Sequence, residues 1–316
     1  MLGEVKMKTY EINRKEHVLE RLIDMALEDA INWITSRCKP QEPDYVAALS
    51  TEFTKTFFHI LAATFPEYDF SVSSVYCHQK PIVDINWGKK PELGDILFLY
   101  VDRTQKGEKI MNSLLLQAKI SEDWVLKIHQ NEKHQLELYK RWPEFTYYRA
   151  GDLNGKKRNI SPKTINDGAQ YLLINSNTIY GITMGCSVPD DTLYINNSLS
   201  KELINLLKFK SGRTVDSDPN LTTDDWSKMI WDLLHVASSK YTKRKNAHLT
   251  FSRYNECTYF CTENMSNVTL LDEEFRKDEN KAGMGGECKA GIGDEDSGVS
   301  VVLIESRRKE ERAIIP

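Results

Sequence analysis

Three polar side chains stand at the ends of two apolar segments of the chain. Asp95 begins DILFLYVD, residues 95–102, while Gln117 and Lys119 come near the end of SLLLQAKI, residues 113–120. Carboxylate and amide oxygens are donors of the kind that Mg²⁺ takes in proteins. An ammonium group beside such an ion can orient or deprotonate a water and stabilise charge on a phosphorane-like transition state. If the three groups converge, they suit hydrolysis of a phosphodiester bond.

The two apolar segments favour such a convergence. Both are apolar on both faces, which predicts central strands, and the polar stretch 103–109 between them predicts an antiparallel hairpin. Pairing around Gly107 places Asp95 opposite the neighbourhood of Lys119, although the sequence leaves the register open. Because side chains alternate along a strand, Gln117 and Lys119 share a face of the sheet.

A further acid is expected from the helix that precedes the hairpin. The apolar periodicity of residues 44–65 predicts this helix, and Glu52 lies on it. Glu52 is about 60° from Leu49 around the helix axis, so it borders the buried face. Glu67 and Glu28 are the substitutes if Glu52 is an ordinary surface acid.

These residues resemble a known pattern. Gly-Asp at 94–95, Gln-Ala-Lys at 117–119 and a preceding helix with Glu52 look like the PD-(D/E)XK nuclease superfamily. The variant resembled has Gln in place of the second acid, as in Mrr-like restriction enzymes. The resemblance covers about residues 44–180. It implies a restriction-endonuclease-like fold, which is a central mixed sheet flanked by helices with a metal site at the splayed ends of two strands.

The helix predicted at 125–142 adds a second match to this family. Gln135 and Tyr139 are four residues apart and therefore lie on one helix face. Their spacing is that of the Q-x3-Y motif of RecB-type members, in which both residues lie near the substrate. Basic residues on the same helix are expected to help bind the substrate: Lys133, Lys140 and Arg141.

The resemblance implies a role for each residue of the first pattern. Asp95 is the metal ligand, Gln117 a weaker neutral ligand, and the backbone carbonyl of Ala118 an extra ligand. Lys119 is the catalytic lysine and Glu52 the outer acid, and the expected ion is Mg²⁺ or Mn²⁺. The chain has Gly-Asp where the family name has Pro-Asp. With Gln117 the site carries one fewer negative charge, so metal binding depends more on Asp95 and Glu52.

Each residue also has an ordinary structural interpretation. Asp95 would cap a turn after Gly94, and Lys119 would be a lysine whose ammonium reaches water from a strand end. Gln117 would be a core amide with satisfied hydrogen bonds. Glu52 would be a surface acid, and the glutamine and tyrosine of the next helix would only pack.

The predicted class is mixed α/β (α+β), with a helical elaboration towards the C-terminus. Further strands are predicted at 68–77, within 169–185 and at 299–306, and a helix at 15–34. The predicted divisions are an N-terminal helix at 1–43, the nuclease core at 44–197, the helical elaboration at 198–279, and a glycine-rich flexible segment with a last strand at 280–316.

The amino-acid composition limits which kinds of protein this chain can be. The 316 residues carry a net charge of −4 and are 40% hydrophobic, which allows a substantial core and requires any anionic partner to meet local basic patches. No apolar run approaches the roughly 20 residues of a membrane helix. Cys257 and Cys261 form the only close cysteine pair, so reduced thiols are favoured over a zinc site. A cytoplasmic protein that does not bind membranes is expected.

The first hypothesis is a metal-dependent nuclease that cuts DNA, in restriction or anti-phage defence. Basic clusters around 127–141, 156–158 and 240–245 are candidates for phosphate contacts without sequence readout. A homo-oligomer or a defence-system partner protein is compatible with this function. The alternative is a nuclease-fold module that binds nucleic acid or a partner protein without cutting, and RNA is the less favoured substrate.

Overall fold

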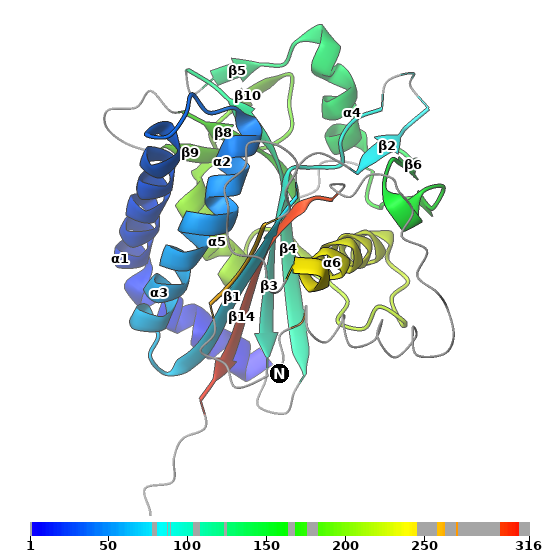
Figure 1. The fold of residues 1–316 in the computed structure, drawn as a ribbon. Helices are drawn as coiled ribbons and strands as arrows, with labels where there is room; N and C mark the ends of the chain where they lie inside the picture. The colour runs from blue at the N-terminus through cyan, green and yellow to red at the C-terminus, as the bar shows by residue number, and fades with distance from the viewer. Residues whose placement is uncertain are drawn as a thin grey trace, which may run out of the picture.

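The chain forms three layers, with helices on both faces of a central sheet (Figure 1). The computed structural model describes residues 2–77, 81–86, 88, 90–103, 108–122, 125–163, 168–175, 183–244, 258–262, 270 and 298–309. This architecture confirms the predicted mixed α/β class with a central mixed sheet. Cys257 and the glycine-rich stretch 280–297 lie outside the described residues.

The central sheet contains nine described strands. They are β1 (Tyr68–Tyr76), β3 (Ile96–Arg103), β4 (Lys109–Ile120), β8 (Ala169–Ile174), β9 (Met184–Ser187), β11 (Asn197–Ser198), β12 (Arg213–Val215), β13 (Thr258–Thr262) and β14 (Ser300–Arg308). Their order is β11-β9-β8-β4-β3-β14-β1-β13, and β12 also pairs with β4. The predicted hairpin is confirmed as β3 and β4, which are antiparallel, whereas β8 runs parallel to β4.

The last strand lies inside this sheet. β14 is parallel to β3 on one side and antiparallel to β1 on the other, and Figure 1 shows it in red between them. The strand predicted at 299–306 therefore completes the centre of the core, although it is far from residues 44–197 in the sequence. Its side chains alternate between the two sides of the sheet.

Alternation along the central strands builds two cores. Leu97, Leu99 and Leu115 face one core, whereas Ile96 and Phe98 face the other, and all five are fully buried. A strand covered on both sides needs apolar residues at every position, which explains the unbroken apolar runs of β3 and β4.

The helices divide between the two faces. One face is covered by α1 (Leu2–Thr35), α2 (Glu42–Ala48), the π-helical turn η1 (Leu49–Phe53), α3 (Thr54–Thr64) and α5 (Leu199–Leu207). The other face is covered by α4 (Lys133–Arg141) and α6 (Asp225–Arg244). The helices after residue 198 thus belong to both layers (Figure 1). None of the described helices combines the length and the apolar character that crossing a bilayer requires.

The helix predicted at 125–142 is wrong before Lys133, where the α-helix begins. Residues Val125–Lys127 form β5, which pairs with β10 (Thr192–Tyr194), and a 3₁₀ turn η2 (Gln130–Glu132) leads into α4. Pairing with β10 overrides the helical pattern, because backbone groups of both strands are satisfied by each other. The helix ends at Trp142, whose φ of 41° is left-handed.

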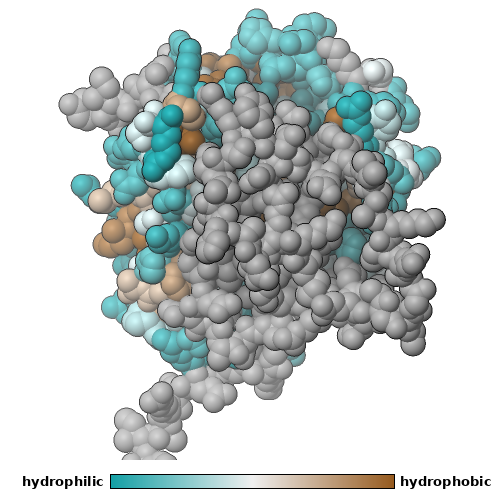
Figure 2. Space-filling view, in the orientation of Figure 1, coloured by the Kyte–Doolittle hydropathy of each residue, from teal (hydrophilic) through white to brown (hydrophobic). Residues whose placement is uncertain are grey.

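A small antiparallel sheet lies beside α4. It consists of β2 (Ile82–Asp84), β6 (Phe145–Tyr148) and β7 (Lys157–Arg158), with a 3₁₀ turn η3 (Gly151–Leu153) between the last two. The described surface around α4 and this sheet is mainly hydrophilic in the space-filling view (Figure 2).

Candidate active site

Asp95 lies where three central strands meet. Its backbone N–H donates to the carbonyl of Leu116 at 2.9 Å, and its carbonyl accepts from the N–H of Ser300 at 3.1 Å. Ile96 pairs with Leu116 in the antiparallel ladder, which sets Asp95 beside Gln117. The register is therefore shifted by two residues from pairing around Gly107.

The carboxylate of Asp95 meets the end of β4. Its Oδ2 accepts from Gln117 Nε2 at 2.5 Å and from the backbone N–H of Ala118 at 2.7 Å. The other polar atom of the amide, Gln117 Oε1, is buried and has no hydrogen-bond partner among the described residues. A buried oxygen without a partner is costly, so this end of the hairpin has the capacity for another ligand.

Lys119 is held between two flanking helical segments. Its Nζ lies 2.9 Å from Glu132 Oε1, at the end of η2, and 3.8 Å from Glu42 Oε2, at the start of α2. Glu42 Oε1 in turn accepts from the N–H of Ile120 at 3.3 Å. Asp95, Gln117 and Lys119 are therefore brought together at one end of the hairpin.

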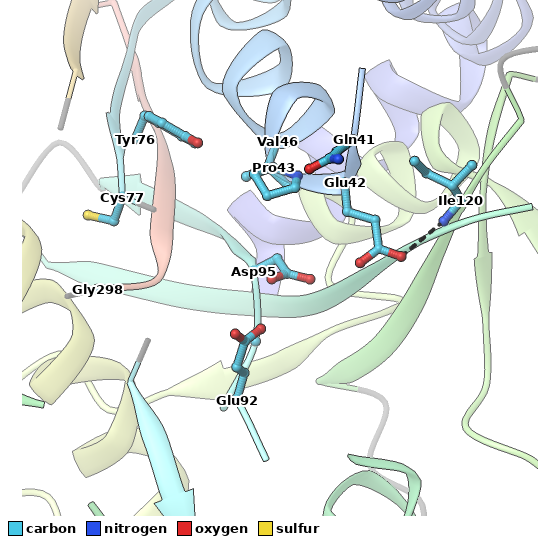
Figure 3. A pocket seen from close by; sticks show the side chains of 11 residues that line it. Gln41, Glu42, Pro43, Val46, Tyr76, Cys77, Glu92, Asp95, Ile120 and Gly298 are labelled. Atoms are coloured by element: carbon cyan, nitrogen blue, oxygen red, sulfur yellow. Dashed lines mark hydrogen bonds between the residues drawn. The ribbon is translucent and has the colours of Figure 1, made fainter. Parts of the chain in front are cut away.

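A cavity of about 460 Å³ opens beside Asp95, which lines it, whereas Gln117 and Lys119 are not among its lining residues. Carboxylates of Glu42, Glu92 and Asp95 line one part of it, and Figure 3 shows Glu92 close to Asp95. The remaining described lining is apolar or neutral: Gln41, Pro43, Val46, Tyr76, Cys77, Gly94, Ile120 and Gly298. The cavity thus combines three carboxylates with apolar and neutral groups.

The crowding of acidic side chains changes their pKa values. Burial and the neighbouring Glu92 and Glu42 together raise the pKa of Asp95 to about 8, although the N–H of Ala118 and the charge of Lys119 act to lower it. Burial also raises the pKa of Glu42, against the attraction of Lys119. Carboxylates that share a space in this way favour binding of either a proton or a cation.

Lys119 has the opposite environment. Burial acts to lower its pKa, but Glu42 and Glu132, with a smaller effect from Asp95, outweigh burial, so the pKa is raised. Its side chain therefore carries a positive charge at neutral pH. It is suited to stabilise an anion and not to take up a proton.

Glu52, which was predicted as the outer acid, lies away from the cavity. Glu52 does not line the cavity, whereas Glu42 from the same continuous helical stretch does. Ten helical residues correspond to about 15 Å along the axis, which separates the two acids. The periodicity of 44–65 predicted which face is buried but not which end of the helix meets the hairpin.

The Q-x3-Y pair is also placed differently from its expected role in substrate binding. Tyr139 is fully buried, and its hydroxyl donates to the carbonyl of Leu93 at 2.9 Å. A Cβ on Gly94 would lie 2.9 Å from this hydroxyl and 2.7 Å from Leu115 Cδ1, so only glycine fits. Tyr139 therefore supports the turn that carries Asp95. Gln135 is likewise buried, with no partner for its Nε2 in the described part of the chain.

The predicted basic contacts on α4 are mostly paired with acids. Lys140 lies 2.9 Å from Asp190, and Arg141 lies 3.0 Å from Glu137. Lys133 is exposed. Lys133 and Arg141, whose side chain stays 65% exposed despite its pair with Glu137, thus retain accessible charge, whereas Lys140 is half-buried and paired.

Three acids of the site were not identified from the sequence. Glu92, Glu42 and Glu132 stand close to Asp95 or Lys119, but they come from separate segments. Glu92 lies three residues before Asp95, which is the one local signal that the sequence contains. The other two become neighbours only through tertiary packing of α2 and η2.

The donor set fits a hard divalent cation in part. Among the described residues, no group of three or more His, Cys, Asp or Glu side chains is arranged to hold a metal ion. A mixed set remains, with the Asp95 carboxylate, the unsatisfied Gln117 oxygen and the nearby Glu92 and Glu42. Such oxygen donors, completed by water, are the ligands that Mg²⁺ takes.

Comparison of the chain with protein-family models, with curated proteins and with solved structures found no match in any of the three.

Proposed function

We propose that this chain is a metal-dependent nuclease with a restriction-endonuclease-like core, acting on DNA. The observation that carries the proposal is the meeting of Asp95, Gln117 and Lys119 at the end of one buried hairpin, beside a cavity with two further acids. Charged side chains are rarely buried in a protein core, so core packing alone does not explain a lysine and several acids at this position.

Asp95, Gln117 and the backbone of Ala118 would hold Mg²⁺ or Mn²⁺, with Glu92 or Glu42 as the outer acid in place of Glu52. When bound, the ion supplies Lewis-acid stabilisation of charge on the phosphate. Its positive charge also offsets the crowding that raises the pKa of Asp95.

Lys119 supplies the second positive charge. Its ammonium donates hydrogen bonds to an oxygen of the phosphodiester while a water attacks phosphorus and loses a proton to solvent; the P–O bond to the leaving oxygen breaks, and this oxygen takes a proton from solvent and departs as the alcohol. Glu132 and Glu42 keep the ammonium at the end of β4. The setting that the proposal favours is restriction or anti-phage defence in the cytoplasm. The chain would act there as a homo-oligomer or with a partner protein.

The test is incubation of the purified chain with plasmid, linear DNA and RNA, in Mg²⁺, Mn²⁺ or EDTA. We expect cutting of DNA that needs the metal and falls at least about 1,000-fold in Lys119→Ala, because charge stabilisation in the transition state is lost. The matched control is Lys55→Ala, an exposed lysine on α3. Absence of cutting by the wild-type chain under all these conditions refutes the proposed hydrolase.

One observation favours a second candidate, a binding module that does not cut. Gln117 turns its amide N–H towards Asp95, so the acid is satisfied by a neutral partner. If the chain is such a module, it would shift DNA in a gel both in EDTA and in Mg²⁺, and no cleavage products would appear. Binding would then be unchanged in Asp95→Asn.

A further inference from the structure

The small sheet β2-β6-β7 continues the wall of the cavity. Glu92, which lines the cavity, lies opposite Ile82, and Ile82 lies opposite Tyr148. Backbone bonds from Val83 to Pro91 and from Leu93 to Pro81, both of 2.8 Å, fix this arrangement. Two strand spacings separate Glu92 from Tyr148, which is about 10 Å.

The pairing also determines which way the side chains point. Residues directly opposite each other in antiparallel strands share a face, so Glu92, Ile82 and Tyr148 lie on one side of the small sheet. Their neighbours Val83, Leu93 and Tyr147 point to the other side and are buried in the core. Tyr148 therefore leaves the sheet on the same side as the acid that faces the cavity.

Tyr148 forms an exposed aromatic platform with cations around it. It remains 43% exposed although Lys90 Nζ lies 3.6 Å from its ring centroid, and Arg149 Cζ lies 5.8 Å from the same centroid. Lys157 emerges on the same face, opposite Thr146, and is also exposed. Asp84 pairs with Lys90 and Glu144 with Lys157.

Arg149 gives the platform its excess of positive charge. It is exposed and adopts a left-handed φ of 52°, and within the described part of the chain it forms no ion pair. An aromatic ring with adjacent cations is the arrangement that binds unpaired nucleotides, because every base has a stacking face and every phosphate a charge.

We infer that this platform, Tyr148 with Lys90, Arg149 and Lys157, binds an unpaired nucleotide of the nucleic-acid strand whose phosphate lies in the cavity. This inference rests on the proposed function for the identity of that phosphate. About 10 Å corresponds to about three nucleotides at duplex spacing and fewer in an extended strand. The substrate class is therefore DNA with a single-stranded or frayed segment next to the cutting position, in preference to continuous duplex.

The test uses the full chain in EDTA, so that binding is measured without cutting. A short fluorescein-labelled oligothymidylate is titrated and its anisotropy recorded at low salt. We expect Tyr148→Ala to weaken binding by roughly 5- to 100-fold, the loss typical of removing one stacking aromatic. Tyr148→Trp retains the affinity, and the matched control Tyr10→Ala leaves it unchanged, since Tyr10 is an exposed tyrosine on α1 with Arg14 over its ring.

Two further measurements separate stacking from charge. Quenching of 2-aminopurine placed within the oligonucleotide is expected in the wild-type chain and is lost in Tyr148→Ala. Arg149→Asn, which tolerates the left-handed backbone, lowers the salt dependence of binding but keeps the quenching. The same dependence on Tyr148 with oligouridylate also supports the platform, because stacking does not require a particular sugar.

Equal affinity of Tyr148→Ala and the wild-type chain overturns the inference, as does failure of the wild-type chain to bind the oligonucleotide. The inference is also overturned if Tyr148→Ala weakens binding of a blunt-ended duplex as much as it weakens binding of the oligothymidylate. Because none of these measurements involves cutting, a chain that binds through Tyr148 but never cuts would refute the proposed hydrolase alone.

Discussion

The two ends of β3 bury carboxylates in contrasting ways. At the far end, Glu305 is fully buried, and Arg103 donates to its Oε1 from two nitrogens at 3.0 and 2.7 Å. The N–H of Leu270 donates to Glu305 Oε2 at 3.1 Å. At the other end, Asp95 accepts hydrogen bonds from two neutral donors, Gln117 Nε2 and the N–H of Ala118, and Glu92 and Glu42 lie near it.

The difference separates a carboxylate that serves stability from one that is suited to bind a ligand. Glu305 has its own cation within the fold, so its charge is neutralised without any ligand. At the Asp95 end the nearby Lys119 is shared with Glu132 and Glu42. The excess of negative charge there is an electrostatic cost to the fold, which binding of a cation relieves.

The largest effect that tests this contrast is expected at Arg103. Arg103→Met leaves Glu305 buried without its cation, and such losses cost about 3–5 kcal/mol of unfolding free energy. Urea denaturation measures it. Lys119→Met is the matched change at the other end and should cost about 1 kcal/mol or less, because its partners are partly exposed. Similar losses in both variants would remove the distinction between the two ends.

The next effect is a dependence of stability on pH that originates at Asp95. Its pKa is about 8 in the folded chain, whereas an unfolded aspartate has a pKa of about 3.9. Between these values the folded chain keeps a proton that the unfolded chain has released. Stability is thus fully present below about pH 4 and declines as pH rises towards about 8.

Asp95→Asn removes this dependence. Between about pH 5 and about pH 9 in EDTA, we expect the wild-type chain to lose about 2 kcal/mol relative to the variant, as measured by urea unfolding. The figure is smaller than the full pKa shift would give, because the carboxylate is open to the cavity. Parallel curves for the two proteins would show that the acids around Asp95 do not strain the fold.

A smaller effect concerns the turn that carries Asp95. Gly94→Ala should cost about 1–3 kcal/mol, since its Cβ would meet Leu115 and Tyr139. Tyr139→Phe should cost about 1 kcal/mol through loss of the hydrogen bond to Leu93. The double variant is expected to lose less than the sum, because the phenylalanine lacks the hydroxyl that the new methyl group meets. Strict additivity in urea denaturation would mean that Tyr139 does not support this turn.

Much of the fold could be predicted from apolar patterning, because patterning reflects burial directly. The continuous runs of β3 and β4 predicted central strands, and the 3.6-residue period of 44–65 predicted the helix from α2 to α3. Pairings between distant segments could not be predicted in the same way. The position of β14 between β1 and β3, and the pairing of Val125–Lys127 with β10, depend on contacts that no local pattern encodes.

The residues of the candidate site likewise divide into those that a local pattern predicts and those that depend on tertiary packing. The three residues on the hairpin could be predicted to converge, because two neighbouring strand ends fix their positions. The acids from outside the hairpin could not, since they depend on how α2 and η2 pack. Tyr139 has the expected spacing, but its burial, which decides between supporting a turn and touching a substrate, is a tertiary property.

The smallest effect distinguishes Glu42 from Glu52 as the outer acid. Glu42 lines the cavity and Glu52 does not, so Glu42→Gln should weaken Mg²⁺ binding by about tenfold, or about 1.4 kcal/mol, while Glu52→Gln leaves it unchanged. Isothermal titration calorimetry after removal of metal with EDTA measures both, and the rise of the melting temperature on adding Mg²⁺ provides a second readout. If Glu52→Gln alone weakened binding, the helix from α2 to α3 would have to present its middle to the hairpin. That arrangement is incompatible with the contact between Glu42 and Lys119, so the pair of variants tests how the site is assembled as well as which acid it uses.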